Sequence, residues 1–154
     1  MHAGPEPPDS SSQIRFGSRE VEIVAVRVLD HRGRQTDRII PGSSFTVEID
    51  FDPHEGVPDA IFGVSVHADG DSTRCFDVST LADGHWIGRL REPGTVGLHI
   101  DRLDLSAGLY HLDVGIHESN WSYPYDYMWE AASLTFSGRN VPAVLVPPHK
   151  WTMR

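Results

Sequence analysis

Cysteine is nearly absent from this 154-residue chain, and long apolar runs are missing altogether. Cys75 is the one cysteine, so no internal disulfide can form, which fits a reducing compartment. No apolar run approaches the ~20 residues that a membrane-spanning helix requires. The first residues include Glu6 and Asp9 and no apolar stretch. We therefore expect no signal peptide and a cytoplasmic location.

Lysine is also scarce, because Lys150 is the only one and the other twelve basic residues are arginines. A phosphate-cradling loop needs Gly-x-x-x-x-Gly-Lys followed by Ser or Thr. The sequence contains no such run, so this chain alone is not expected to be an ATPase. Its net charge of −9 disfavours nucleic acid and anionic membranes as partners.

Recognisable catalytic and metal-binding motifs are missing as well. There is no Gly-x-Ser-x-Gly elbow, and Cys75 has no obvious histidine partner. The nine histidines form no His-x-His or His-Glu-x-x-His spacing, so the zinc signal is weak. A cupin-like site built from His67 with His111, Asp113 and His117 is the alternative. We expect no catalytic residues, no metal and no cofactor.

What the sequence does contain is β-strand patterning. Residues 1–13 are rich in Pro and Ser and are expected to be a disordered linker or tail. From residue 14 to residue 154 we expect one β-sandwich domain. Phe45, Val47, Ile49 and Phe51 alternate with polar residues, which is typical of a half-buried strand.

Similar runs are expected at 21–29, 61–68, 74–79, 95–103, 110–116, 134–136 and 143–146. Gly, Pro and Asp turns separate these strands, and no amphipathic helix is evident. About eight short strands predict an all-β fold, an antiparallel β-sandwich of immunoglobulin-like or jelly-roll type. Tyr110, just after the turn at Gly108, is expected to form a tyrosine corner.

Two of the expected strands carry an unusual polar face. One presents Gly63, Ser65 and His67, and the other presents the face formed by His111, Asp113, Gly115 and His117. Small residues leave a hollow, while His and Asp supply directional hydrogen bonds. If these strands are neighbours in one sheet, the two faces form a shallow groove. The alternative is an ordinary solvent-exposed sheet face.

The segment 117–129 holds five of the eight Trp and Tyr residues, all at odd positions. In an extended segment these rings would lie on one side, which suits stacking on sugar rings. Pro124 argues for a loop or an edge position. The alternatives are rings that plug one end of the sandwich, or a surface that docks a partner protein. The expected carbohydrate-binding residues are Ser65, His67, His111, Asp113, His117, Trp121, Tyr123 and Tyr125.

Several stretches together resemble a known family. The run from Arg15 to Asp30 is similar to the opening strand of the C-terminal carbohydrate-binding domain of Wzt, the ATPase subunit of the ABC transporters that export O-antigen polysaccharide. Further stretches follow in the order that this family shows, and the likeness covers about residues 14–151. These stretches are Phe62 to Val66, Leu105 to Tyr110, His117, Tyr125 with Asp126, Leu134 to Phe136, and Pro147 to Trp151.

The resemblance implies a β-sandwich that recognises the end of a finished, lipid-linked O-antigen-type polysaccharide on the cytosolic side of the membrane, within a transporter complex. It also implies a homodimer with exchanged C-terminal strands. That role would fall to Ala143, Val144, Leu145 and Val146, an apolar run bounded by prolines. The alternative is an edge strand added to the chain's own sheet. The family's ATPase half has no counterpart in this sequence, so we expect a non-catalytic binding module.

Overall fold

The computed structural model describes residues 14–71 and 73–153, and the regular structure in this part is entirely β-strand. The expected tail, residues 1–13, lies outside the described residues. None of the described residues belongs to a helix that could span a membrane. The strands are β1 (Arg15–Phe16), β2 (Glu22–Asp30), β3 (Arg38–Ile39), β4 (Phe45–Asp52), β5 (Ile61–Ala68), β6 (Arg74–Ser79), β7 (Gly94–Ile100), β8 (Gly108–His117) and β9 (Pro124–Phe136).

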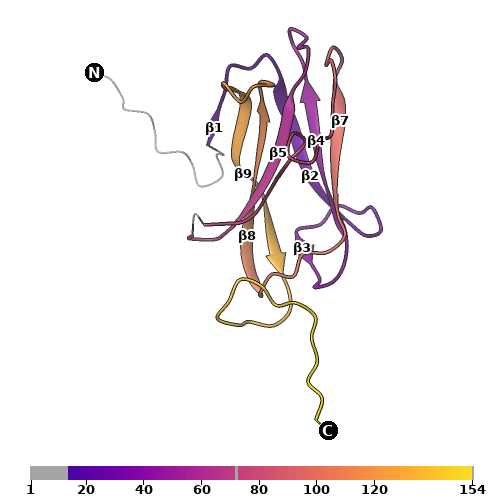
Figure 1. Ribbon diagram of the computed structural model, residues 1–154, viewed down its shortest axis with the longest axis vertical. Coiled ribbons are helices and arrows are strands. Elements are labelled where there is room, and N and C mark those ends of the chain that lie inside the picture. Colours follow the sequence, from indigo (N-terminus) through magenta and orange to yellow (C-terminus); the bar gives the residue numbers. More distant parts are fainter. Residues whose placement is uncertain (1–13, 72, 154) are drawn as a thin grey trace, which may run out of the picture.

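The strands form two packed sheets, which confirms the antiparallel β-sandwich (Figure 1). The larger sheet has the order β1-β9-β8-β5-β6, with β3 also pairing with β9, and the smaller sheet has the order β2-β4-β7. All these pairings are antiparallel except that of β3 with β9. The β8–β9 turn and the C-terminal segment lie at opposite ends of the sandwich (Figure 1).

Alternating side chains build the core between the sheets, as the sequence predicted. Phe45, Val47, Ile49 and Phe51 of β4 are buried, while the residues between them stay partly exposed. They pack against the inward face of the larger sheet, where the rings of Phe51 and Phe62 lie 5.4 Å apart. Each buried side chain of this size stabilises the fold by about 1.5–3 kcal/mol.

Tyr110 forms the predicted tyrosine corner. Its ring is buried, and its hydroxyl donates a hydrogen bond to the backbone carbonyl of Ser106 at 2.9 Å. The Ser106 hydroxyl lies 3.1 Å from the same phenol oxygen. This bond fixes the turn that leads into β8, the strand that carries most of the predicted polar face.

The longest strand was the least well predicted. The sequence placed a strand only at 134–136, whereas β9 begins at Pro124 and has 13 residues. Pro124 occupies the first position of β9, where a missing N–H interrupts the ladder least. Two register shifts between β8 and β9 further hide the alternation from the sequence.

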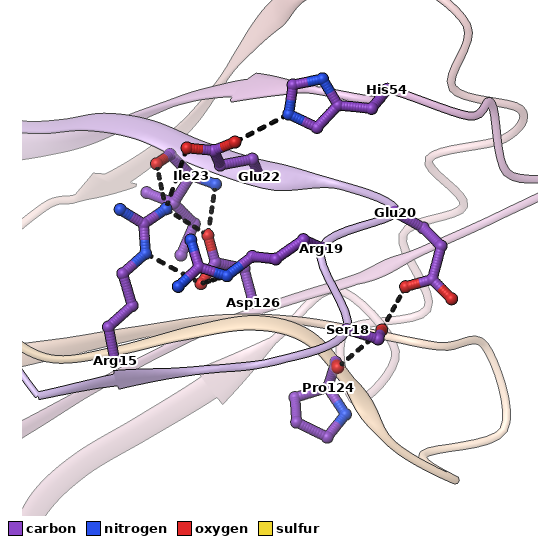
Figure 2. Close-up of polar contacts among 9 residues, drawn as sticks. All are labelled: Arg15, Ser18, Arg19, Glu20, Glu22, Ile23, His54, Pro124 and Asp126. Atoms are coloured by element: carbon purple, nitrogen blue, oxygen red, sulfur yellow. Dashed lines mark hydrogen bonds and ion pairs between the residues drawn. The ribbon is translucent and has the colours of Figure 1, made fainter.

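Asp126 of β9 joins the two sheets at a buried ionic contact (Figure 2). Its fully buried carboxylate accepts hydrogen bonds from the Arg15 guanidinium and, at 2.7 Å, from the backbone N–H of Ile23 in β2. Nε of Arg19 lies 3.7 Å from the same carboxylate. The contact ties β1 and the smaller sheet to β9, which lines the site described next.

Candidate binding groove

The outer face of the larger sheet is hollow because two glycines pair at its centre. Phe16, Tyr127, Gly115 and Gly63 are successive register partners across β1, β9, β8 and β5. Two aromatic rings therefore stand beside two positions with no side chain. A Cβ at Gly115 would lie 2.7 Å from Cε1 of His117 and 2.9 Å from Cδ2 of Tyr127. The missing side chain at Gly115 thus allows the rings of His117 and Tyr127 to lie next to the hollow.

The hollow is a groove of about 150 Å³ over β5, β6 and β8. The predicted pairing of the two polar faces is confirmed, because Ser65 pairs with Asp113 and His67 pairs with His111. Ser65, Asp113, His117 and Trp121 line the groove, as expected. The complete lining is Gly63, Val64, Ser65, Arg74, Asp77, Asp113, Gly115, His117, Trp121 and Tyr127.

Three rings line one margin of the groove, and a fourth, Phe16, continues the row beyond the lining. These rings are called here the aromatic row: Trp121, His117, Tyr127 and Phe16. The centroids of Trp121 and His117 are 4.7 Å apart, and those of His117 and Tyr127 are 6.1 Å apart. Phe16 stacks on Tyr127 at 5.0 Å. Trp121 is 46% exposed, so it offers part of its ring to a ligand.

Asp113 supports the groove from below. Its side chain is almost fully buried, and Oδ1 accepts a hydrogen bond from the backbone N–H of Glu130 at 2.7 Å. Nδ1 of His67 lies 3.1 Å from Oδ2 of Asp113, although the two atoms are not aligned for a hydrogen bond. Glu130 has a positive φ of 53° and sits where three residues of β9 oppose Asp113 alone. Asp113 therefore holds this bulge in place.

His67 and His111 lie on the expected face, but other side chains cover them. His67 is 4% exposed because the Trp129 ring stacks on it at 4.9 Å. His111 has Ser133 Oγ at 2.9 Å on one ring nitrogen and Asp69 Oδ1 at 2.7 Å on the other. The expectation that both rings are open to a ligand is wrong, since the Trp129 ring covers His67, and Ser133 and Asp69 occupy the ring nitrogens of His111.

The expectation that all five aromatic rings share one side is also wrong. Tyr125 belongs to the core, and its burial raises its pKa to about 12. The register shifts by one residue between Ile116 and His117, because β9 bulges at Tyr125 and its ring turns inward. Tyr123 lies near Glu20, 3.4 Å from phenol oxygen to carboxylate, and is not among the groove residues.

Polar groups at the rim suit hydroxyl recognition. Arg74 and Asp77 of β6 form an exposed ion pair at 2.8 Å and line the groove with donors and acceptors. Burial raises the pKa of Tyr127 and lowers the pKa of His117. Near neutral pH both rings are therefore uncharged, and the row presents polar but neutral walls. Among residues 14–71 and 73–153, no three His, Cys, Asp or Glu side chains gather to hold a metal ion.

Sequence reasoning left Arg74, Asp77 and Tyr127 out of the site. The hairpin register could have found the first two, because Asp77 pairs with Ser65 and Arg74 pairs with His67. Tyr127 lay within the aromatic segment, but its pairing with Gly115 depends on the bulge at Tyr125.

The segment Ala143–Val146 forms no strand in the single chain. It makes one isolated bridge, Leu105 with Leu145, and two backbone hydrogen bonds to residues 104 and 106. Val144 and Leu145 remain about half exposed. The segment thus rests loosely on its own chain and presents apolar side chains to solvent.

The molecule is a β-sandwich domain with a ring-lined groove on its larger sheet. The family model of the Wzt C-terminal domain matches residues 12–144, and the chain belongs to this family. It is 27% identical over 131 residues to the O-antigen export system ATP-binding protein RfbB of Myxococcus xanthus. That match covers 85% of this chain and 29% of the relative, so the chain spans under a third of that protein's length.

A solved structure shows the same fold. The crystal structure of the C-terminal domain of wzt superposes with a TM-score of 0.79 at 14% sequence identity, covering 96% of this chain and 92% of that chain. The family resemblance seen in the sequence is therefore confirmed. The Wzt C-terminal domain is the part of the transporter subunit outside its ATPase.

Proposed function

We propose that this chain is a non-catalytic carbohydrate-binding domain that recognises an O-antigen-type polysaccharide for export by an ABC transporter. The groove carries the proposal: paired glycines open a hollow, rings wall one margin, and small polar side chains line the rest. Family membership supports the same function.

The groove offers the contacts that a sugar needs. The exposed part of Trp121 stacks on the apolar face of a pyranose ring. Ser65, Arg74 and Asp77 supply donors and acceptors for its hydroxyl groups. The chain's net charge of −9 favours a neutral polymer over a polyanionic one.

The proposed partners are the ATPase and membrane subunits of the exporter, which would hold the domain at the cytoplasmic face of the inner membrane. The relative from Myxococcus xanthus is named as the ATP-binding protein of an O-antigen export system, which supports this assembly. Polysaccharide in the cytoplasm could then reach the groove before it crosses the membrane.

We further propose a homodimer in which Ala143–Val146 is exchanged between two chains. The half-exposed Val144 and Leu145 support exchange, because a partner chain could bury them. Light scattering of the wild type and of Leu145→Asp tests it. We expect the wild type to have the mass of a dimer and Leu145→Asp to have the mass of a monomer. Equal masses for the two proteins would contradict strand exchange.

Calorimetric titration with polysaccharide purified from the encoding strain tests the function. Wild-type protein should bind, and Trp121→Ala should weaken binding by at least about tenfold, which is ~1.4 kcal/mol. Trp151→Ala is the matched control, because this ring is 92% exposed in the C-terminal segment and lies outside the groove. If the domain instead forms a stable complex with a partner protein and added polysaccharide has no effect on that complex, the alternative is favoured, in which the sandwich binds a protein rather than a sugar.

A further inference from the structure

A second hollow continues the groove along the same strand. Phe62, Val64 and Val66 of β5 point into the core, so Ile61, Gly63 and Ser65 share the outer face. Gly63 and Ser65 line the groove, whereas Ile61 lines a larger hollow of about 530 Å³, called here the end hollow. Ile61 is buried but lies outside the core cluster, which agrees with its outward direction.

The two hollows share one partition. His117 is the register partner of Ile61, and Trp121 packs on the His117 ring. The β8–β9 turn places Trp121 in the groove and Ser119 with Asn120 in the end hollow. Residues 61 and 63 are one two-residue step apart on the strand, about 7 Å. That step is comparable to the length of one sugar unit in a chain.

The lining of the end hollow also suits a sugar. Trp86 is 75% exposed, so a wide flat face is open beside the apolar Ile61. Ser119 and Asn120 bring hydroxyl and amide groups to the opposite wall. Oδ1 of Asp59, another lining residue, is buried and has no hydrogen-bond partner among the described residues. A buried acceptor without a donor destabilises the free protein, and a ligand hydroxyl that donates to this oxygen would remove that cost.

We propose that the end hollow is a second sugar subsite, with Trp86 as its stacking platform. The groove and the end hollow together read at least two consecutive units of one polysaccharide, on either side of the His117–Trp121 partition. This inference rests on the proposed function, because it extends the same site. With this second subsite, the domain recognises a segment of the polysaccharide rather than a single sugar unit.

Size-fractionated oligosaccharides from partial hydrolysis of the strain's polysaccharide provide the probes. Affinity of the wild type should rise at least about tenfold from one-unit to two- or three-unit fragments. Trp86→Ala should remove that rise and leave one-unit binding unchanged, whereas Trp121→Ala should weaken every fragment. Since Trp86 is so exposed, its substitution should not unfold the domain, and Trp151→Ala again serves as control.

The outcomes separate the two proposals. If Trp86→Ala binds all fragments like the wild type while Trp121→Ala weakens them, the second subsite is wrong and the groove stands. If the wild type binds no fragment, or if Trp121→Ala changes nothing, the groove assignment is wrong and the second subsite goes with it.

Discussion

Ser65 of β5 and Asp113 of β8 are register partners on the outer face of the larger sheet, and both line the groove. Their position is set by the strand ladder rather than by a loop. Asp113 in turn holds the bulge that carries Trp129 and Glu130. The shape of the groove therefore depends on strand pairing, which makes it a preformed site.

Gly115→Ala should close the groove without unfolding the sandwich. The new methyl group would meet the rings of His117 and Tyr127 at under 3 Å, so those rings must shift. We expect a stability loss of about 1–3 kcal/mol and binding of the polysaccharide weakened at least about tenfold. Gly97→Ala is the control, because its nearest new contact is Thr46 at 3.8 Å. Unchanged affinity for Gly115→Ala would contradict the role of the hollow.

Asp113→Ala should act through stability. It leaves the Glu130 N–H without its acceptor, at a cost of about 2 kcal/mol. Asp77→Ala at the exposed rim should change the free energy of unfolding by no more than about 0.5 kcal/mol and still weaken binding. Urea denaturation measures both variants. If Asp113→Ala is as stable as the wild type, the proposed role of Asp113 in holding the β9 bulge is contradicted.

Asp126→Ala should be among the most destabilising single changes. The substitution leaves the Ile23 N–H and the partly buried Arg15 guanidinium without their partner. We therefore expect the free energy of unfolding to fall by about 3 kcal/mol. Asp50→Ala breaks the more exposed pair with Arg27 and should cost under about 1 kcal/mol. Thermal unfolding compares the two variants. A smaller loss of stability for Asp126→Ala than for Asp50→Ala would contradict the role of the Asp126 contact in joining the sheets.

His117 and His54 should titrate on opposite sides of the ordinary histidine pKa of about 6.5. Burial lowers the pKa of His117, whereas the hydrogen bond with Glu22 raises the pKa of His54. His117 therefore destabilises the fold as the pH falls below about 6.5, since the unfolded chain then binds more protons. The contribution of His54 is present below that pH and is lost as the pH rises through its folded pKa. Ring-proton NMR measures both midpoints, and the reverse order would contradict this account.

The sequence predicted the parts of the fold whose alternation is regular. The strands at 45–52, 61–68 and 74–79 were predicted with the boundaries that the structure shows. Apolar and polar residues alternate throughout 45–52 and from 62 to 68, and the turn at 69–71 indicated that 74–79 pairs with 61–68 as a hairpin. The two small polar faces indicated that the strands carrying Ser65 and Asp113 are neighbours in one sheet, and the structure adds their register. The tyrosine corner followed from Tyr110 and the preceding Gly108 turn.

The rest depended on β9, whose register no local pattern reveals. A one-residue bulge sends Tyr125 into the core, and a second bulge lays Trp129 over His67. Ser119 and Asn120 come from the β8–β9 turn and Trp86 comes from the β6–β7 connection, and these two loops meet only at the end of the sandwich. Their proximity is a tertiary result, so strand periodicity could not predict it.

Chemical-shift mapping tests the central claim most directly. Amide NMR spectra of the labelled domain would be recorded during titration with short fragments of the strain's polysaccharide. The largest shifts are expected at the groove positions Gly63, Ser65, Gly115, His117, Trp121 and Tyr127. Shifts confined to the C-terminal segment, or to the 31–37 connection between β2 and β3, would contradict a glycan site on this face.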